Sequence, residues 1–386
     1  MLIDVPVDIQ LQELGEFQYP KTVDIKGYKP STAGHSIQIR RVCEALGAAK
    51  RPVICAGGGI FAAGALGEFR AFVQKTGIPA ANTMMGIGAL PSKHPLCLGM
   101  LGSHGVRAAN TAIHNADLIL LLGARVGDRA VASPGQVAER AKIVHIDIDP
   151  AEIGKNMPAH IPVVGDLKLV LAELCRLAVP GVWDEWRAQC EQAKEQPAKI
   201  AEPPPGFVEP KAFMALLSAL VDDDAVLVAD VGQNQIWSAN HFEVKNGRFL
   251  TSGGMGTMGY SVPAAAGAKL AAPGRQVCAV CGDGSFQMQM MELGTIIQHD
   301  IPLKIIVMRN ARLGMVCELQ NRLYRGNETQ VALDGSPDFI ALAAAYGIPG
   351  ARVTQNGGAR AAIQKMLAAK GPYLLECAVA PNQPSL

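Results

Sequence analysis

Residues 276–310 are QVCAVCGDGSFQMQMMELGTIIQHDIPLKIIVMRN. The short apolar runs at 276–281 and 303–308 indicate two buried strands, and the pattern of 285–299 between them indicates a helix. Such a strand–helix–strand unit is a right-handed crossover, which places both strands in one sheet with their carboxyl ends at the same edge. We therefore predict an α/β domain with a parallel sheet around this stretch.

The same alternation continues on both sides of this unit. Apolar runs that indicate strands occur at 51–56, 118–122, 142–147, 225–230 and 373–378. Segments with helical periodicity occur at 37–49, 66–76, 211–220 and 359–369. Strands that alternate with helices of this length are typical of βαβ units. The sequence predicts the α/β class, with two doubly wound domains, each on a parallel sheet.

A polar segment that ends in Glu202-Pro-Pro-Pro-Gly206 separates the two α/β regions. Its Gln, Lys, Glu and Pro content is typical of a linker. Residues 1–20 stand before the first α/β region, and the alternation within 1–10 indicates a strand. The predicted divisions are 1–20, a first domain at 21–180, a linker at 181–206 and a second domain at 207–386.

Composition excludes several classes of function. The 386 residues carry a formal net charge of +1, and no run of Lys and Arg exceeds two residues, whereas a nucleic-acid-binding surface needs a basic cluster. Apolar stretches such as 118–122 are too short to span a bilayer, and the acidic residues and proline of 1–10 do not resemble a signal peptide. Nine cysteines without framework spacing are typical of a cytoplasmic protein.

Two of these cysteines, Cys278 and Cys281, form a CxxC pair. In a strand, a spacing of three places the two side chains on opposite faces of the sheet, so they cannot bind one metal ion together. No second CxxC exists in the sequence. We therefore predict buried core cysteines rather than a metal or redox site.

Asp283 follows the first strand of the 276–310 unit, and Asn310 follows the second. If these strands are neighbours, they lie about 4.8 Å apart, and a carboxylate and an amide oxygen at their ends can share one Mg²⁺. Gly282 and Gly284 let a diphosphate approach the backbone, and the amides at the start of the following helix attract it. A plain glycine turn is the alternative, and the position of Asn310 favours the magnesium–diphosphate site.

Residues 282–310, with the continuation Ala311-Arg312-Leu313-Gly314-Met315-Val316, resemble the diphosphate-binding motif of thiamine-diphosphate enzymes in its acetolactate synthase form. The resemblance extends over essentially the whole chain. It implies that Asp283, Asn310 and the carbonyl of Arg312 bind Mg²⁺, and that Met258 holds thiamine diphosphate in its bent, reactive shape. The other residues that it implies for this cofactor are Val231, Gly232, Gln233, Asn234, Gly256, Gly284, Ser285, Leu313, Gly314 and Met315.

The first α/β region resembles the central domain of the same family, which binds FAD as a structural cofactor at the strand ends. Catabolic relatives lack FAD, and Gly127 replaces an acidic residue of the family's pattern. In the family, the residue that matches Arg129 receives the carboxylate of the second 2-oxo acid, a role that suits a planar guanidinium. The residues implied for FAD are Gly57, Gly58, Met100, His104, Gly123, Ala124, Arg125, Asp147, Ile148 and Asp166.

Two further positions depart from the family's pattern. Asn234 stands where the family often has His, and it keeps a hydrogen-bonding group. Leu319, within CELQ at 317–320, stands where many biosynthetic members have Trp in RQWQ. That Trp shapes the acceptor pocket and the herbicide site, so its replacement weakens the expectation of a preference for 2-oxobutyrate over pyruvate and predicts poor sensitivity to sulfonylureas.

The resemblance implies a carboligase that decarboxylates pyruvate and joins the two-carbon unit to a second 2-oxo acid, in branched-chain amino acid biosynthesis. Residues 1–20 resemble the end of the family's pyrimidine-binding domain, and no glutamate of this chain matches the activating glutamate of that domain. We therefore expect activity to require such a domain from outside the chain, in a homodimer or tetramer with a possible regulatory subunit.

The same residues leave two alternative functions open. One is a non-catalytic, cofactor-binding fragment. Another is a different thiamine-diphosphate carboligase or decarboxylase, such as glyoxylate carboligase. A nicotinamide dehydrogenase is excluded, because no GxGxxG follows a strand with an acidic residue about 20 positions later.

Overall fold

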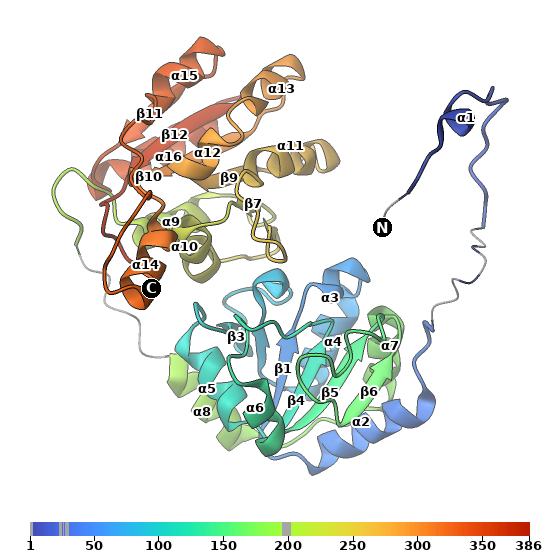
Figure 1. The fold of residues 1–386 in the computed structure, drawn as a ribbon. Helices are drawn as coiled ribbons and strands as arrows, with labels where there is room; N and C mark the ends of the chain where they lie inside the picture. The colour runs from blue at the N-terminus through green and yellow to red at the C-terminus, as the bar shows by residue number, and fades with distance from the viewer. Residues whose placement is uncertain (1–2, 23–24, 26, 28–30, 195–201) are drawn as a thin grey trace.

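The computed structural model describes residues 3–22, 25, 27, 31–194 and 202–386. It contains two six-stranded sheets, and every strand pair in both is parallel. Helices lie against both sheets, the first sheet in blue to green and the second in yellow to red (Figure 1). The prediction of an α/β fold with two parallel sheets is confirmed.

The first sheet has the strand order β3-β2-β1-β4-β5-β6, so the direction of winding reverses between β1 and β4. Open sheets of this kind bind ligands at that reversal, beyond the carboxyl ends of the strands. Its strands are β1 (Pro52–Ala56), β2 (Ala80–Asn82), β3 (Cys97–Met100), β4 (Leu118–Leu122), β5 (Lys142–Asp147) and β6 (Ile161–Val164). Its helices are α2 (Ser36–Ala48), α3 (Gly59–Ala62), α4 (Leu66–Thr76), the 3₁₀ turn η1 (Met84–Gly86), α5 (Arg107–Asn115), α6 (Pro134–Arg140), α7 (Leu167–Leu177) and α8 (Asp184–Lys194).

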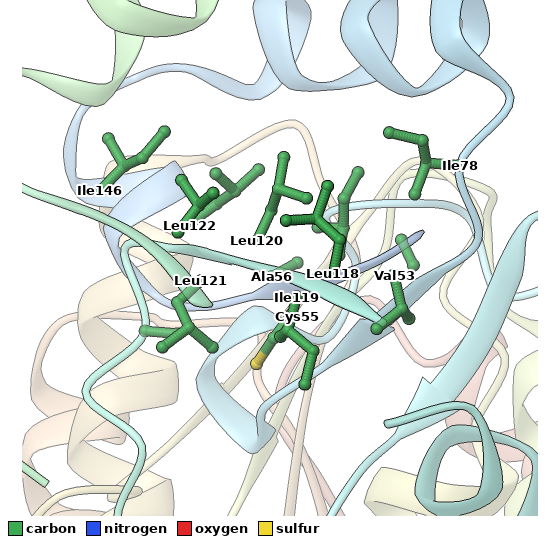
Figure 2. Packing of buried hydrophobic residues seen from close by; sticks show 14 of the residues in the cluster. Val53, Cys55, Ala56, Ile78, Leu118, Ile119, Leu120, Leu121, Leu122 and Ile146 are labelled. Carbon is green, nitrogen blue, oxygen red and sulfur yellow. The ribbon is translucent and has the colours of Figure 1, made fainter. Parts of the chain in front are cut away.

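The core of the first sheet surrounds β4, whose sequence is LILLL. All five of its residues are buried, because helices cover both faces of a parallel sheet. Leu120 and Leu122 project to one side of the strand and Leu121 to the other, and Ile146 of the neighbouring β5 packs beside them (Figure 2).

The second sheet has the order β11-β12-β10-β9-β7-β8. Strands β9 and β10 are neighbours, with Val307 beside Cys281, as the 276–310 stretch predicts. Its strands are β7 (Val226–Ala229), β8 (Arg248–Thr251), β9 (Val277–Gly282), β10 (Lys304–Arg309), β11 (Gly350–Val353) and β12 (Tyr373–Ala378). Its helices are α9 (Pro210–Leu220), α10 (Gln233–His241), α11 (Ser261–Ala271), α12 (Asp283–Gln287), α13 (Glu292–Gln298), α14 (Gly314–Leu323), α15 (Phe339–Ala345) and α16 (Asn356–Ala368).

The cysteines of the CxxC pair lie on opposite faces of β9, as predicted. Cys278 packs in the cluster that contains Leu227, and Cys281 packs in the separate cluster that contains Phe286. Both side chains are fully buried. In the part of the chain that the structure describes, no three or more His, Cys, Asp or Glu side chains are grouped so that they could hold a metal ion.

The helix predicted at 285–299 is wrong in one respect, because two helices, α12 and α13, occupy this range with a turn between them. The reason is Gln289 in that turn, which is 2% exposed. Its amide donates to Asp230 Oδ2 at 2.9 Å and accepts from the backbone N–H of Val262 at 2.8 Å. The turn brings this polar side chain into the protein to satisfy two buried groups.

The strand predicted within residues 1–10 is also wrong for the described residues. A four-residue helix, α1 (Val7–Gln10), lies there with no buried residue, apart from the two sheets in Figure 1. An alternating segment forms a strand only beside a partner strand, and none pairs with it among the residues that the structure describes. Residues 1–2 lie outside the described residues.

Helix α8 falls within the predicted linker at 181–206. Its Trp186 and Cys190 are buried in the core of the first sheet, and Trp186 Nε1 donates to the carbonyl of Pro52 at 2.9 Å. Residues 184–194 are therefore a helix that packs on the first sheet rather than linker. The remainder of the predicted linker includes residues 195–201, which lie outside the described residues. None of the helices described is long and apolar enough to cross a membrane.

Each sheet and the helices that cover it form one layer, and the two layers contact each other directly. The side chain of Asn240 in α10 donates to the carbonyl of His104 at 2.8 Å. The guanidinium carbon of Arg248 in β8 lies 3.0 Å from the ring centroid of Phe61. Met100 at the end of β3 is buried in a cluster made mainly of residues from the second layer. The edges that carry the predicted residues of both layers are thus held in a fixed relation.

Candidate functional site

A cavity of about 150 Å³ opens where β7, β9 and β10 end. Because all three strands are parallel, their carboxyl ends meet at one edge of the sheet. Gly256, in the loop after β8, is the one residue predicted for thiamine diphosphate or Mg²⁺ that is absent from the lining. The predicted residues that line the cavity are Val231, Gly232, Gln233, Asn234, Met258, Asp283, Gly284, Ser285, Asn310, Arg312, Leu313, Gly314 and Met315.

Asp283 is 1% exposed at the bottom of this edge. Its Oδ1 accepts from the N–H of Gly284 at 3.0 Å, and its Oδ2 accepts from the N–H of Ala311 at 2.6 Å. Burial raises the pKa of this carboxyl to about 6, against the lowering effect of the N–H groups and of Arg309. A carboxylate that is costly to bury as an anion and keeps free lone pairs fits a divalent cation as its partner.

Asn310 lies at the end of the neighbouring strand with both ends of its amide engaged. Its Nδ2 donates to Gln233 Oε1 at 3.0 Å, and its Oδ1 accepts from the N–H of Arg312 at 3.1 Å. Ala311, between Asn310 and Arg312, has φ +56°, a left-handed conformation that costs free energy for a residue with a side chain. The sharp turn is held by Leu333, whose N–H donates to the carbonyl of Ala311 at 2.9 Å. This strained turn brings Arg312 to the cavity, as the predicted metal site requires.

Met258 reaches the same edge from the loop after β8. A Cβ on Gly284 would lie 2.8 Å from Leu313 Cδ2 and 3.6 Å from Met258 Cε. The glycine therefore leaves room for two apolar side chains directly over the backbone of the β9–α12 turn. Such an arrangement fits a ligand that has a charged diphosphate at the backbone and a flat, apolar ring against the side chains.

Asp230, at the end of β7, is a residue whose importance the sequence did not indicate. It is fully buried, and its carboxylate accepts from the N–H groups of Val231, Gly259 and Ser261 and from the amide of Gln289. Two of these donors flank the turn that follows Met258. Asp230 therefore anchors the loop of Met258 to the sheet. The sequence signal was an aspartate that ends an apolar strand at the carboxyl edge, in LVAD at 227–230.

The residues predicted for FAD lie along the corresponding edge of the first sheet. Gly57 and Gly58 follow β1, and Gly123 follows β4, on the two sides of the winding reversal. A Cβ on Gly57 would lie 2.0 Å from the carbonyl oxygen of Gly123, so these glycines allow the two turns to touch. The other residues of this set are Met100, His104, Ala124, Arg125, Asp147, Ile148 and Asp166.

Several members of this set also have structural roles. Asp166 caps α7 by accepting from the N–H groups of Lys168 and Leu169. Asp147 accepts from the N–H of Asp149 at 3.0 Å, and Met100 is 4% exposed. Arg125 and Ile148 are exposed. Closely packed glycine turns after β1 and β4 and the guanidinium of Arg125 lie at the winding reversal, where open sheets bind dinucleotides, and FAD binding stays a prediction.

Arg129 lies outside the cavity lining, with an exposed side chain. Its carbonyl accepts from the N–H of Ser103 at 2.9 Å, which ties its loop to the loop of His104. Burial lowers the pKa of His104, the positive charge of Arg129 lowers it further, and Glu318 in α14 opposes this shift. The role of Arg129 with a 2-oxo acid stays a prediction.

The chain matches two family models. Residues 39–174 match the thiamine pyrophosphate enzyme central domain, and residues 230–377 match the thiamine pyrophosphate enzyme C-terminal TPP-binding domain. Thiamine pyrophosphate is another name for thiamine diphosphate. The two matches correspond to the two sheets and include the edges described above.

Comparison with individual proteins gives the same assignment. The chain is 39% identical to a probable acetolactate synthase large subunit of Methanocaldococcus jannaschii, over 99% of this chain and 66% of that protein. It is also 39% identical to the acetolactate synthase large subunit of Lactococcus lactis, over 99% of this chain and 66% of that protein. A chloroplastic acetolactate synthase of Zea mays is 39% identical, over 99% of this chain and 62% of that protein.

The chain thus spans about two thirds of the length of these relatives. The first sheet falls within one matched family model, and the second sheet falls within the other apart from β7 and the last residue of β12. The alignment to the first of these relatives covers 99% of the chain. The chain belongs to the thiamine pyrophosphate enzyme family, of which it carries the central and C-terminal domains, and it is related to acetolactate synthase large subunits.

Proposed function

We propose that the chain is part of an acetolactate synthase-type carboligase, which decarboxylates pyruvate and joins the two-carbon unit to a second 2-oxo acid. The observation that carries this proposal is the cavity where β7, β9 and β10 end. It brings together Asp283, Asn310, Arg312 and Gln233 in a chain that is 39% identical to acetolactate synthase large subunits. A role in branched-chain amino acid biosynthesis follows from the same relationship.

In the proposed enzyme, Asp283, the side chain of Asn310 and the carbonyl of Arg312 hold Mg²⁺ through oxygen atoms. Gly232 has φ +137°, which only glycine adopts readily, and this lets the backbone before α10 turn toward the diphosphate. Gln233 and Ser285 supply polar atoms at the same edge. Together these groups fix the charged end of the cofactor.

Thiamine diphosphate, when bound, supplies the carbon nucleophile that 2-oxo acid decarboxylation requires. Met258 supports the cofactor ring from the apolar side of the cavity. Leu313, Met315 and Leu319 form apolar walls that exclude water from the reacting carbon atoms. Arg129 holds the carboxylate of the second 2-oxo acid through its planar guanidinium.

The proposal includes partners that the described residues do not supply. A pyrimidine-binding domain provides the acid that activates the cofactor, because positioning alone does not replace this proton transfer. We expect a homodimer or tetramer, a possible regulatory subunit and structural FAD at the edge of the first sheet. A cytoplasmic location is the expectation from the cysteine pattern.

The test is acetolactate formation from pyruvate with thiamine diphosphate, Mg²⁺ and FAD, measured with and without an added pyrimidine-domain chain. Activity only after the addition is the expected result. Turnover by the chain alone would contradict the need for an activating group from outside. Cofactor binding without turnover in either mixture would favour a non-catalytic fragment, and a product other than acetolactate would favour another carboligase or decarboxylase of the family.

A further inference from the structure

A polar cluster lies behind the cavity, between α10, α14 and the chain around residue 384. Gln233 occupies its centre, with Asn310 on the cavity side and Glu318 on the other. We propose that Glu318 is a positioning residue, which acts through Gln233 to make Asn310 present its oxygen to the divalent cation. The proposal rests on the proposed function, because it concerns the same cation site.

The first step is the direction of the Gln233 amide. Its Nε2 lies 2.8 Å from Glu318 Oε1 and 2.7 Å from the carbonyl oxygen of Gln383. An ionised carboxylate and a backbone carbonyl can only accept hydrogen bonds. The NH₂ group of Gln233 must therefore face these two acceptors, and its Oε1 must face Asn310.

The second step is the direction of the Asn310 amide. Since Gln233 Oε1 accepts, the NH₂ group of Asn310 must be the donor at 3.0 Å, and this fixes Oδ1 on the opposite side. There Oδ1 accepts from the N–H of Arg312 at 3.1 Å and keeps its second lone pair. A flipped amide would set an NH₂ group against the N–H of Arg312 and remove the oxygen that a Mg²⁺ ligand needs.

The third step is the fixing of Glu318 itself. Its Oε1 accepts from the backbone N–H of Ser385 at 2.6 Å, and its Oε2 accepts from the hydroxyl of Ser385 at 2.7 Å. Ser385 is 4% exposed, and the adjacent Pro384 accepts from Trp237 Nε1 at 2.9 Å. The two hydrogen bonds from Ser385 therefore fix the orientation of the Glu318 carboxylate. Glu318 in turn fixes the orientation of the Gln233 amide, and Gln233 fixes that of the Asn310 amide.

The identity of residue 318 matters to this argument. A Gln at this position could present either an oxygen or an NH₂ group. Glu presents only acceptors, so this chain imposes the direction chemically. A Gln can still turn its oxygen toward Gln233, which makes Glu318→Gln the conservative variant and Glu318→Leu the disruptive one.

The experiment measures Mn²⁺ affinity of the full chain by the loss of the free-ion EPR signal, with thiamine diphosphate at saturation. We expect Glu318→Leu to weaken Mn²⁺ binding about tenfold or more, as supporting groups of metal ligands do. Glu318→Gln should stay within about twofold of the unchanged chain. If both variants bind as the unchanged chain does, the proposal is wrong. If the unchanged chain binds no Mn²⁺, the proposed function fails instead, so the two failures are distinguishable.

A rescue variant separates positioning from general damage. Asp has an oxygen on both sides of its carboxylate, so its ability to bind a cation does not depend on a flip. We expect Asn310→Asp to restore Mn²⁺ binding in the Glu318→Leu chain to within about threefold. Continued weak binding in a double variant with an unchanged thermal midpoint would contradict the proposal.

Ser385→Ala provides a second route if Glu318→Leu does not fold. It removes one donor to Glu318 and leaves the Glu318–Gln233 hydrogen bond possible. Mn²⁺ binding should weaken by about twofold to fivefold, and Asn310→Asp should again remove the effect. An unchanged affinity in Ser385→Ala, with Glu318→Leu unfolded, would overturn the proposal.

Discussion

The N–H of Ser261, at the start of α11, donates to Oδ2 of Asp230, at the end of β7, over 2.7 Å. A second N–H, from Gly259, donates to Oδ1 of the same carboxylate at 3.1 Å. Met258 therefore precedes a segment that is fixed to the sheet by one aspartate. The position of the predicted cofactor support therefore depends on a buried carboxyl group that accepts hydrogen bonds from several N–H donors.

Asp230→Asn tests this dependence. The substitution replaces one acceptor by an NH₂ group that faces N–H donors, so we expect the free energy of unfolding to fall by about 2 to 4 kcal/mol. Thiamine diphosphate affinity should fall as well, because the Met258 loop loses its anchor. Urea unfolding and titration calorimetry measure the two effects. Asp224→Asn is the matched control, since Asp224 is half exposed in an ion pair with Arg275 and should change stability by less than about 0.5 kcal/mol.

Gly314→Ala should damage the cation site directly. A Cβ at this position would lie 1.9 Å from Gln233 Oε1 and 2.8 Å from Asn310 Nδ2, so Gln233 must move. We expect Mn²⁺ affinity to fall about tenfold to a hundredfold. The control is Gly267→Ala in the middle of α11, where a Cβ meets nothing within 4 Å. That variant should gain about 0.5 to 1 kcal/mol of stability from the better helix propensity of Ala. Equal metal affinities for the two variants would refute this reading of the site.

Stability should depend on pH through His241. Burial, and then the charge of Lys211, lowers the pKa of this half-buried side chain from 6.5 to about 4. The unfolded chain therefore binds more protons than the folded chain between pH 4 and pH 6.5. The contribution of His241 to the free energy of unfolding is at its full value above pH 6.5 and falls as the pH is lowered through this window. Urea unfolding at several pH values measures this loss of stability. In His241→Gln, the fall in the free energy of unfolding between pH 6.5 and pH 4 should be smaller by an amount on the order of 1 kcal/mol.

A matched variant for this measurement is His299→Gln, because His299 is an exposed residue after α13. We expect the pH dependence of its urea midpoint to match that of the unchanged chain. A flat profile in both variants, or an unaltered profile in His241→Gln, would show that acid stability has another source.

Leu319→Trp tests the acceptor pocket of the proposed enzyme. Leu319 lines the cavity, and a larger flat side chain there adds apolar contact for a longer acceptor. One additional CH₂ in contact is worth about 0.8 kcal/mol, so the product ratio for 2-oxobutyrate against pyruvate should rise about fourfold. Competition between the two acids measures the ratio. Leu323→Trp, at an exposed position on the same helix, should leave the ratio unchanged.

The sequence predicted the second sheet through short-range patterns that carry their own geometry. The crossover at 276–310 requires parallel strands, and the structure has β9 beside β10 with Asp283 and Asn310 at one edge. The spacing of Cys278 and Cys281 predicted opposite faces, and the two separate clusters confirm it. These inferences succeeded because period and chain order determine them without knowledge of distant residues.

The failures share a different cause. In the break between α12 and α13, Gln289 donates to Asp230, which is distant in sequence. Helical periodicity contains no information about such a partner. The buried Trp186 of α8 is hidden within a polar segment whose composition suggested a linker. The cluster of Gln233, Glu318 and Ser385 is formed by three distant segments. In each case a long-range contact overrides the local pattern.

The position of Met100 has a consequence for how the molecule unfolds. This residue ends a strand of the first sheet, yet its side chain belongs to the hydrophobic cluster of the second. The shared apolar contacts are lost when either layer unfolds, so we expect the unfolding of the two layers to be coupled. A dinucleotide that binds only the folded first layer would then raise the melting temperature of both. Ligand binding at the edge of the first sheet would thus stabilise the second sheet against unfolding, although the ligand does not contact it.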